Sequence, residues 1–385
     1  MFARKLNATT LVMVALVGAA HAQVPDLLNS FDPGGRGMGV GGGIAAAGSD
    51  TQSTLNNPAG LAHVTQRSVS VTLRNKPQSR TTATSTFRNP VLDTKGEVGP
   101  IGIAHIGYVM PVGSPEAPRG GIGISYTTVG YVRDQRVGNG GLILDATSSV
   151  TDYQELLKGQ TDMFAVGYGW GNGDKSLTFG ASLLLASHYT LNRQTYSIST
   201  GGGQPIPNPP LDLSGTGTGI GGVVGVQLIP RSNPNLSFGA SVRTPINLSG
   251  NGTTAAYYDD IPGKISLGVA YRKDGYRGGQ DYAVFGLQAD AFFKNERGQA
   301  FSRKRAVSVG GGVEYNMLRG NARIPVRLGF QAVPAAGAGF KERNAFTFGV
   351  GYRPFNRPFS LDLNFASPSG GGGFDTALHL NFKVK

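Results

Sequence analysis

A strict alternation of apolar and polar residues, repeated from about Ser68 to the C-terminus, limits the folds open to this chain more than any other feature. Successive side chains of a β-strand point to opposite faces, so each alternating run predicts a strand with one apolar face. One such run reads Phe346-Thr347-Phe348-Gly349-Val350-Gly351-Tyr352-Arg353. The pattern predicts an all-β protein built from many amphipathic strands.

The alternating runs divide the chain into about fourteen strands. Their approximate spans are 68–75, 101–112, 120–135, 161–171, 176–197, 213–230, 235–250, 262–273, 280–295, 303–318, 323–333, 343–353, 358–366 and 375–384. Most of these spans reach the roughly 9–11 residues that a tilted strand needs to cross a bilayer. An even number of strands also lets both ends of a closed barrel lie on one side of a membrane.

The connections between these strands alternate in length. Every second one is short and rich in Gly, Pro, Asn and Asp, the residues that make tight turns: Gly113–Pro118, Gly171–Asp174, Arg231–Pro234, Asp274–Gly279, Arg319–Asn321 and Pro354–Arg357. The others are longer, above all 76–100, 136–160 and 198–212. Short turns on one rim and long loops on the other are typical of outer-membrane barrels. We therefore predict a transmembrane antiparallel β-barrel located in the bacterial outer membrane.

The N-terminus and the composition agree with export. Residues 1–22 have a basic start, an apolar run and an Ala20-His21-Ala22 cleavage site, which predicts a secretory signal peptide. After Ala20 no apolar run is long enough for a membrane helix, so the chain either stays soluble after export or spans as a closed barrel. The chain has no Cys, which excludes disulfides and a lipid anchor on a terminal cysteine. The formal charge is +12, but we find no nucleic-acid-binding motif.

Aromatic residues lie close to the predicted short turns, where a membrane barrel carries its aromatic girdle. The strands that lead into those turns or into the C-terminus carry Tyr108, Trp170, Tyr271, Tyr315, Tyr352 and Phe382. The alternative is that these rings cap the core of a soluble protein.

The polar face of the strands is the predicted inner face. It consists mostly of Gly, Ser, Thr, Ala and Asn, with charges of both signs. The candidate lumen-facing charges are Arg272, Asp290, Glu314, Arg323, Arg327, Arg353 and Asp362, and parity adds Arg74 and Lys294. Charges of both signs predict either ion pairs to a plug or a water-filled lumen.

Residues 23–67 do not alternate. Residues 34–43 are too rich in glycine for a regular strand, and residues 44–55 predict a short helix that ends at Asn56-Asn57-Pro58. We predict three parts: a signal peptide (1–22), a compact hatch inside the lumen (23–67) and the barrel (68–385). The alternative for 23–67 is a disordered periplasmic leader.

Several stretches resemble the long-chain fatty-acid transporter (FadL) family of outer-membrane proteins. They are Arg36-Gly37-Met38-Gly39, Ala45-Ala46-Ala47, Asn57-Pro58-Ala59-Gly60-Leu61-Ala62, Ile261–Arg272, Arg323–Phe330 and Phe346–Arg353. The resemblance implies a fourteen-stranded barrel with an N-terminal hatch, and a lateral opening through a kinked third strand. The candidate gating residues are Asn57, Pro58, Ala59 and Gly60, and the candidate kink residues are Gly120, Gly121, Gly123 and Gly130.

Two features depart from the family pattern. The last residue is Lys385 rather than the aromatic residue that is common at this position in such barrels, although Phe382 is close. Recognition by the barrel-assembly machinery would therefore differ in detail. The third of the longer connections, 198–212, is shorter than the other two and Pro-rich from Pro205 to Pro210. The resemblance therefore does not extend to a surface site that captures long acyl chains.

We find no catalytic constellation, no nucleotide-binding loop and no metal-ligand spacing among the five His residues, so neither an enzyme nor a cofactor is predicted. The leading hypothesis is passive, hatch-gated uptake of hydrophobic or amphipathic small molecules, long-chain fatty acids or similar compounds. The expected partners are this ligand, outer-membrane lipid and the barrel-assembly machinery, without nucleic acid. The alternatives are a structural or secretion-associated barrel with the same hatch, and a general porin.

Overall fold

The computed structural model describes most of the strand-rich part of the chain and two pieces of the N-terminal segment. The described residues are 34–42, 48–75, 80–84, 91–95, 102–114, 117–139, 142–143, 148–200, 204, 206–207, 209–252, 260–293, 295–298, 301–303, 305–334, 343–368 and 374–384. The predicted signal peptide, the Ala45-Ala46-Ala47 stretch, Lys294 and Lys385 lie outside them. No helix in this part of the chain is long and apolar enough to cross a membrane.

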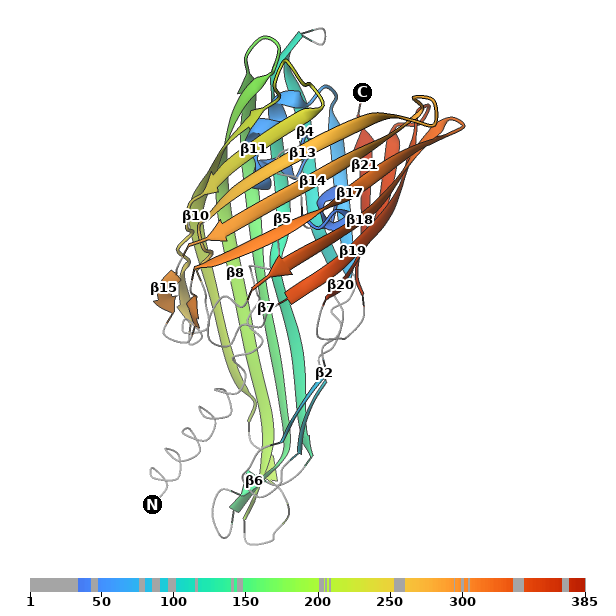
Figure 1. Ribbon diagram of the computed structural model, residues 1–385. Helices are drawn as coiled ribbons and strands as arrows, with labels where there is room; N and C mark the ends of the chain where they lie inside the picture. Colours follow the sequence, from blue (N-terminus) through green and yellow to red (C-terminus); the bar gives the residue numbers. More distant parts are fainter. Residues whose placement is uncertain are drawn as a thin grey trace.

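Fourteen antiparallel strands pair side by side in one closed ring (Figure 1). In ring order they are β1 (Ser68–Asn75), β4 (Gly102–Ser114), β5 (Ala117–Asn139), β7 (Ser148–Gly171), β8 (Leu177–Thr200), β10 (Leu211–Leu228), β11 (Leu236–Arg243), β13 (Lys264–Tyr276), β14 (Asp281–Phe292), β17 (Ala306–Arg319), β18 (Ala322–Val333), β19 (Arg343–Pro354), β20 (Phe359–Pro368) and β21 (Asp375–Lys383). The described residues also contain seven shorter strands outside the ring: β2 (Arg80–Thr84), β3 (Val91–Lys95), β6 (Leu142–Ile143), β9 (Ile206–Pro207), β12 (Ser249–Gly252), β15 (Asn295–Gly298) and β16 (Phe301–Arg303).

The ring closes between its first and last strands. Ser68 of β1 lies opposite Lys383 of β21, and the pairing continues to Asn75 and Thr376. The other edge of β1 pairs with β4, so β1 is hydrogen-bonded to a neighbour on both sides. Lipid requires this, because the bilayer core offers no water to an unpaired N–H or C=O group.

The apolar faces point outward, as the alternation predicts. Side chains such as Ile220 (69% exposed) and Leu287 (65%) lie on the outer surface, whereas the polar residues between the apolar ones, such as Thr72 (0%) and Ser125 (1%), are buried inside. Trp170, beside a short turn, stacks on Tyr168 and Phe179 with ring centroids 5.7 and 6.2 Å apart. A soluble protein would hide this surface, so the outer face fits a lipid environment.

One side of the barrel extends far beyond the rest (Figure 1). β7 and β8 have 24 residues each and remain paired from Gly171 and Thr178 to Ser148 and Thr200. β5 and β10 flank them over much of this length. We call the part of these four strands that projects at the long-loop side the arm.

Three parts of the predicted layout differ from the structure, and the arm accounts for the first two. Much of the predicted loop 136–160 continues β5 and β7, and the predicted loop 76–100 contains the hairpin of β2 and β3, which pairs with the far end of β5. The predicted strand 235–250 is broken after Arg243, because Ile246 turns inward against Gly219 and Gly221 and is fully buried.

Candidate functional site

The described pieces of the N-terminal segment lie against the inner wall at the short-turn end. They contain α2 (Arg36–Gly39), α3 (Ser53–Asn56) and the 3₁₀ helix η3 (Pro58–His63). Pro58 fits the first position of η3, and the Oδ1 atom of Asn57 accepts a hydrogen bond from the N–H of Ala59 at 3.2 Å. The predicted helix within 44–55 is limited in the described residues to α3. The segment meets the wall in two patches of different chemistry.

The first patch, which we call the neutral seat, is formed by α3 and η3 against β5, β7, β8 and β10. Leu61 and Ala59 are completely buried in it. A Cβ atom built on Gly180 would collide with the backbone of Pro58 and Ala59, and one on Gly169 would collide with the backbone of Pro58 and Ala62. The wall lacks side chains at these places, so helix backbone and strand backbone touch.

Several hydrogen bonds in the neutral seat join amides, carbonyls and hydroxyls. The Nδ2 group of Asn57 donates to the carbonyl of Val226 at 3.2 Å, and the hydroxyl of Ser241 donates to the carbonyl of Asn56 at 2.6 Å. The hydroxyls of Thr54 and Ser125 are 2.5 Å apart. Nearby, Thr51 contacts the side chains of Ser70 and His105.

The predicted gating residues all lie in the neutral seat. Asn57, Pro58, Ala59 and Gly60 are buried. The side-chain amide of Asn57 contacts the backbone of β10. Gly60 packs so tightly that a Cβ atom would collide with the carbonyl oxygen of Gly48.

A latch at the rim joins η3 to the turn between β7 and β8. The Nζ group of Lys175 donates to the carbonyl of Ala62 at 2.7 Å, and the Nε2 atom of His63 lies 3.5 Å from the hydroxyl of Thr178. Burial, and then the charge of Lys175, lower the pKa of His63 below its ordinary value of 6.5. The imidazole is therefore neutral at neutral pH.

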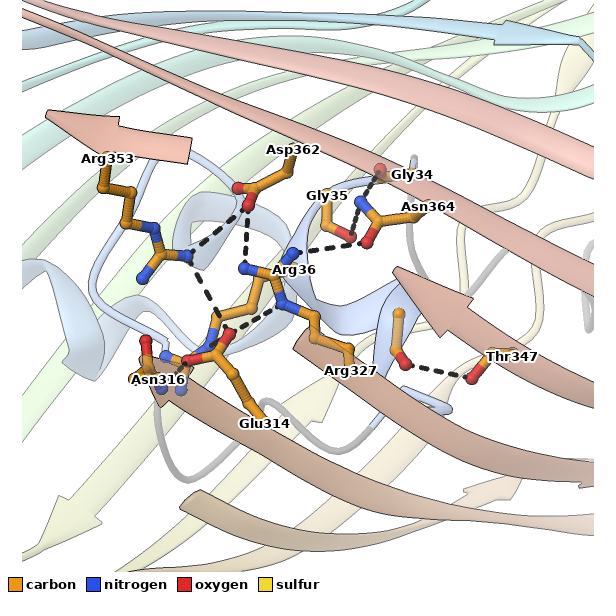
Figure 2. A network of polar contacts seen from close by, with 11 residues as sticks. Gly34, Gly35, Arg36, Glu314, Asn316, Arg327, Thr347, Arg353, Asp362 and Asn364 are labelled. Atoms are coloured by element: carbon orange, nitrogen blue, oxygen red, sulfur yellow. Dashed lines mark hydrogen bonds and ion pairs between the residues drawn. The ribbon is translucent and has the colours of Figure 1, made fainter. Parts of the chain in front are cut away.

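The second patch, which we call the charged anchor, surrounds α2 (Figure 2). The Oε2 atom of Glu314 accepts from the Nε groups of Arg36, at 3.0 Å, and of Arg327, at 2.7 Å. The Nη2 atom of Arg327 lies 2.8 Å from Asp362, a contact that joins the two charges without a well-aligned hydrogen bond. Arg353 reaches Glu314 and Asp362 at 3.8 and 3.7 Å. Buried charges are tolerated because they neutralise one another.

Backbone contacts complete the anchor. The amide of Asn364 donates to the carbonyls of Gly34 and Gly35 at 3.2 and 3.0 Å, and the hydroxyl of Thr347 donates to the carbonyl of Gly39 at 3.2 Å (Figure 2). Gly41 ends this turn with φ +68°, and its carbonyl would collide with a Cβ atom on Gly310. Glycine is suited to both positions.

The predicted lumen-facing charges fall into three groups. Glu314, Arg327, Arg353 and Asp362 belong to the anchor. Asp290 lies farther toward the long loops, 3.8 Å from Lys264. Arg272 of β13 and Arg323 of β18 lie near the short-turn rim, and both contact the ring of Tyr282. The sequence did not single out Arg36, Lys264 or Asn364 as members of these groups, because the pattern of one strand does not show which residue an inward side chain contacts.

The predicted kink glycines lie in β5, and two of them serve packing. Gly121 and Gly123 face Leu61, where a Cβ atom would clash. The irregularity of β5 comes later: the register with β7 shifts between Thr128 and Gly130, a β-bulge that leaves Val129 unpaired and buried. β4 stops pairing with β5 at Thr127, and β3 begins only at Gln135. Among the described strands, this stretch of β5 has a neighbour on one side only.

An apolar cluster lies inside the barrel between the neutral seat and the arm. Leu55 of α3 packs there with inward side chains of β5, β7, β8 and β10 and with the inward turn after β11: Val129, Met163, Ala165, Leu184, Ala186, Val223, Ile246, Leu248 and Ile261. A second, smaller apolar cluster consists of Leu61, Val64 and Val109. The cluster around Leu55 connects the seat with the β5 bulge.

A closed barrel with a lipid-facing outer surface, a polar inner wall and a folded segment against that wall belongs to the outer-membrane β-barrels. No family model and no curated protein sequence matches the chain.

Solved structures share the fold over nearly the whole chain. The Ralstonia pickettii toluene transporter TbuX superposes with a TM-score of 0.57 at 14% identity, covering 91% of this chain and 98% of that one. The P. putida toluene transporter TodX gives 0.58 at 12% identity (92% and 99%), and a Pseudomonas aeruginosa FadL homologue gives 0.55 at 14% (91% and 98%). The resemblance to the FadL family is thus confirmed in the fold.

Proposed function

We propose that this protein takes up hydrophobic or amphipathic small molecules across the outer membrane. The transporters that share its fold include carriers of toluene. The observation that carries the proposal is the apolar cluster around Leu55, which offers a hydrophobic solute apolar side chains inside the barrel. A general porin needs a water-filled lumen. Here the two patches hold a folded segment inside the lumen, which disfavours that alternative.

In this proposal the N-terminal segment is the hatch. A solute entering from the long-loop side meets the apolar cluster and is stopped by the neutral seat. Two ways out are compatible with the contacts. The hatch shifts and opens the short-turn mouth, or the solute leaves sideways where β5 bulges at Val129 and lacks a partner strand.

The absence of Cys from the chain allows a direct test of hatch movement. Thr54→Cys and Ser125→Cys would place two thiols where hydroxyls now lie 2.5 Å apart, one on α3 and one on β5. If the seat has to open, oxidation should reduce uptake of radiolabelled toluene at least about tenfold in cells, and a reductant should restore it. Each single Cys variant is the control. Equal uptake by the oxidised and reduced double variants would contradict hatch gating.

A further inference from the structure

Two arginine side chains lie against one tyrosine ring on the inner wall near the short-turn mouth, and a third arginine, which also belongs to the charged anchor, lies beside one of them. The guanidinium carbon of Arg272 lies 4.1 Å from the ring centroid of Tyr282, and that of Arg323 lies 4.7 Å from it. Arg353 of β19 is the direct neighbour of Arg323 across the sheet. Like charges in this position repel each other unless an anion lies between them.

The acidic groups nearby do not balance these charges. Asp274 pairs with Arg272 at 2.8 Å at the exposed rim. Glu314 and Asp362 bind Arg327 at 2.7 and 2.8 Å, and Arg353 reaches them only at 3.7 Å or more.

Arg323 has no acidic partner among the residues that the structure describes. Its Nη1 atom is buried there without a hydrogen-bond partner. A buried donor without an acceptor costs free energy, and a guanidinium group offers a planar pair of donors that matches a carboxylate. The stacked Tyr282 ring holds the Arg323 fork in place, so little side-chain freedom would be lost when an anion binds.

We propose that Arg323, with Arg353 and Arg272, forms an oxyanion site that binds the carboxylate head of an amphiphilic ligand at the short-turn mouth. This rests on the proposed uptake function and adds a preference for acids over neutral hydrocarbons. Arg353 is the link to the hatch, because it lies 30% exposed between this site and the charged anchor. A bound carboxylate would draw Arg353 from Glu314 and Asp362, which remain paired to Arg327.

The test is calorimetric titration of the full-length protein in nanodiscs with sodium decanoate, 1-decanol and inorganic phosphate. We expect saturable decanoate binding, at least tenfold weaker binding of decanol and no competition from phosphate at equal concentration. Arg323→Gln should weaken decanoate binding about ten- to a hundredfold, the range for a lost charge-assisted hydrogen bond. Arg323→Lys, which keeps the charge and removes the fork, should fall between. Arg231→Gln, at an exposed turn, is the matched control.

Three results would overturn the site: equal decanoate affinity of Arg323→Gln and the natural protein, equal affinity for decanol and decanoate, or displacement of decanoate by equimolar phosphate. Heat-modifiable gel mobility of each variant shows that its barrel is folded. Toluene uptake separates the two proposals. If Arg323→Gln imports toluene normally, the proposed uptake function stands, whatever the titration shows. The test with the oxidised Thr54→Cys/Ser125→Cys variant measures hatch movement and does not depend on Arg323.

Discussion

The two patches that hold the N-terminal segment differ in the forces that they use. The neutral seat around η3 has apolar side chains, amides and hydroxyls, and its wall is lined by glycine, so the fit depends on volume. The charged anchor around α2 is a network of three arginines and two acids, so it depends on charge balance. Breaking a contact between neutral groups leaves no unpaired charge, whereas separating a buried ion pair leaves two. If the segment moves as we propose, the comparison predicts that the neutral seat opens and that the charged anchor stays fixed.

The largest expected effect is on the anchor. Glu314→Gln keeps the shape but leaves Arg36, Arg327 and Arg353 with too little negative charge, and breaking such a buried pair costs about 3–5 kcal/mol. We expect a loss of this size in the free energy of unfolding, measured by urea titration in lipid vesicles. Asp212→Asn, which breaks the exposed Arg193–Asp212 pair, should cost at most about 1 kcal/mol. Similar losses in both variants would show that the network does not anchor α2.

The next effect is on the volume of the neutral seat. Gly180→Ala places a methyl group against the backbone of Pro58, and overpacking of this kind costs about 1–3 kcal/mol. The strand itself tolerates alanine, so the hatch should be displaced while the barrel remains closed. We expect faster swelling of proteoliposomes in a small sugar. Gly173→Ala, where a Cβ atom meets nothing within 4 Å, is the control, and equal swelling of both would contradict the close fit.

A smaller effect is expected from the cap of η3. Asn57→Ala removes both the hydrogen bond to Ala59 and the one to Val226, and loss of such a cap costs about 1 kcal/mol. Asn57→Asp keeps the acceptor for Ala59 and loses the donor to Val226. If the contact with β10 holds the hatch, hydrogen exchange of the η3 amides should rise in both variants. A rise in Asn57→Ala alone would limit the role of Asn57 to capping.

The smallest effect is the pH response of the latch. The pKa of His63 is lowered in the folded protein, so below about pH 6.5 the unfolded chain binds a proton that the folded one does not. The free energy of unfolding should therefore fall as the pH is lowered from 7.5 to 5, by about 1 kcal/mol or less from this group. His63→Asn should flatten that part of the profile. An unchanged profile would remove His63 from the latch.

Strand number, strand parity and the alternation of short and long connections were predictable because each depends on residues close together in the sequence. Glu314, Arg327 and Asp362, which parity assigns to the inner face, are buried. Their partner was not predictable, because Arg36 lies 278 residues from Glu314 and only the closed ring brings them together. The β5 bulge was indicated only in part. Gly130 was one of four candidate kink residues, but the sequence did not show that the register shifts beside it at Val129, where one extra residue reverses which side chains point inward.

The arm has a consequence for how these molecules behave beside one another. Beyond the closed ring it is an open four-stranded sheet, and an open sheet has two borders whose amide groups can recruit a strand from a neighbouring molecule. Two small strands partly cover those borders: β3 lies along Gln135–Asn139 of β5, and β12 lies along Gly215–Thr218 of β10. If this cover limits pairing between molecules, shortening the connection that carries β3 should turn a dispersed protein into one that clusters through its arms.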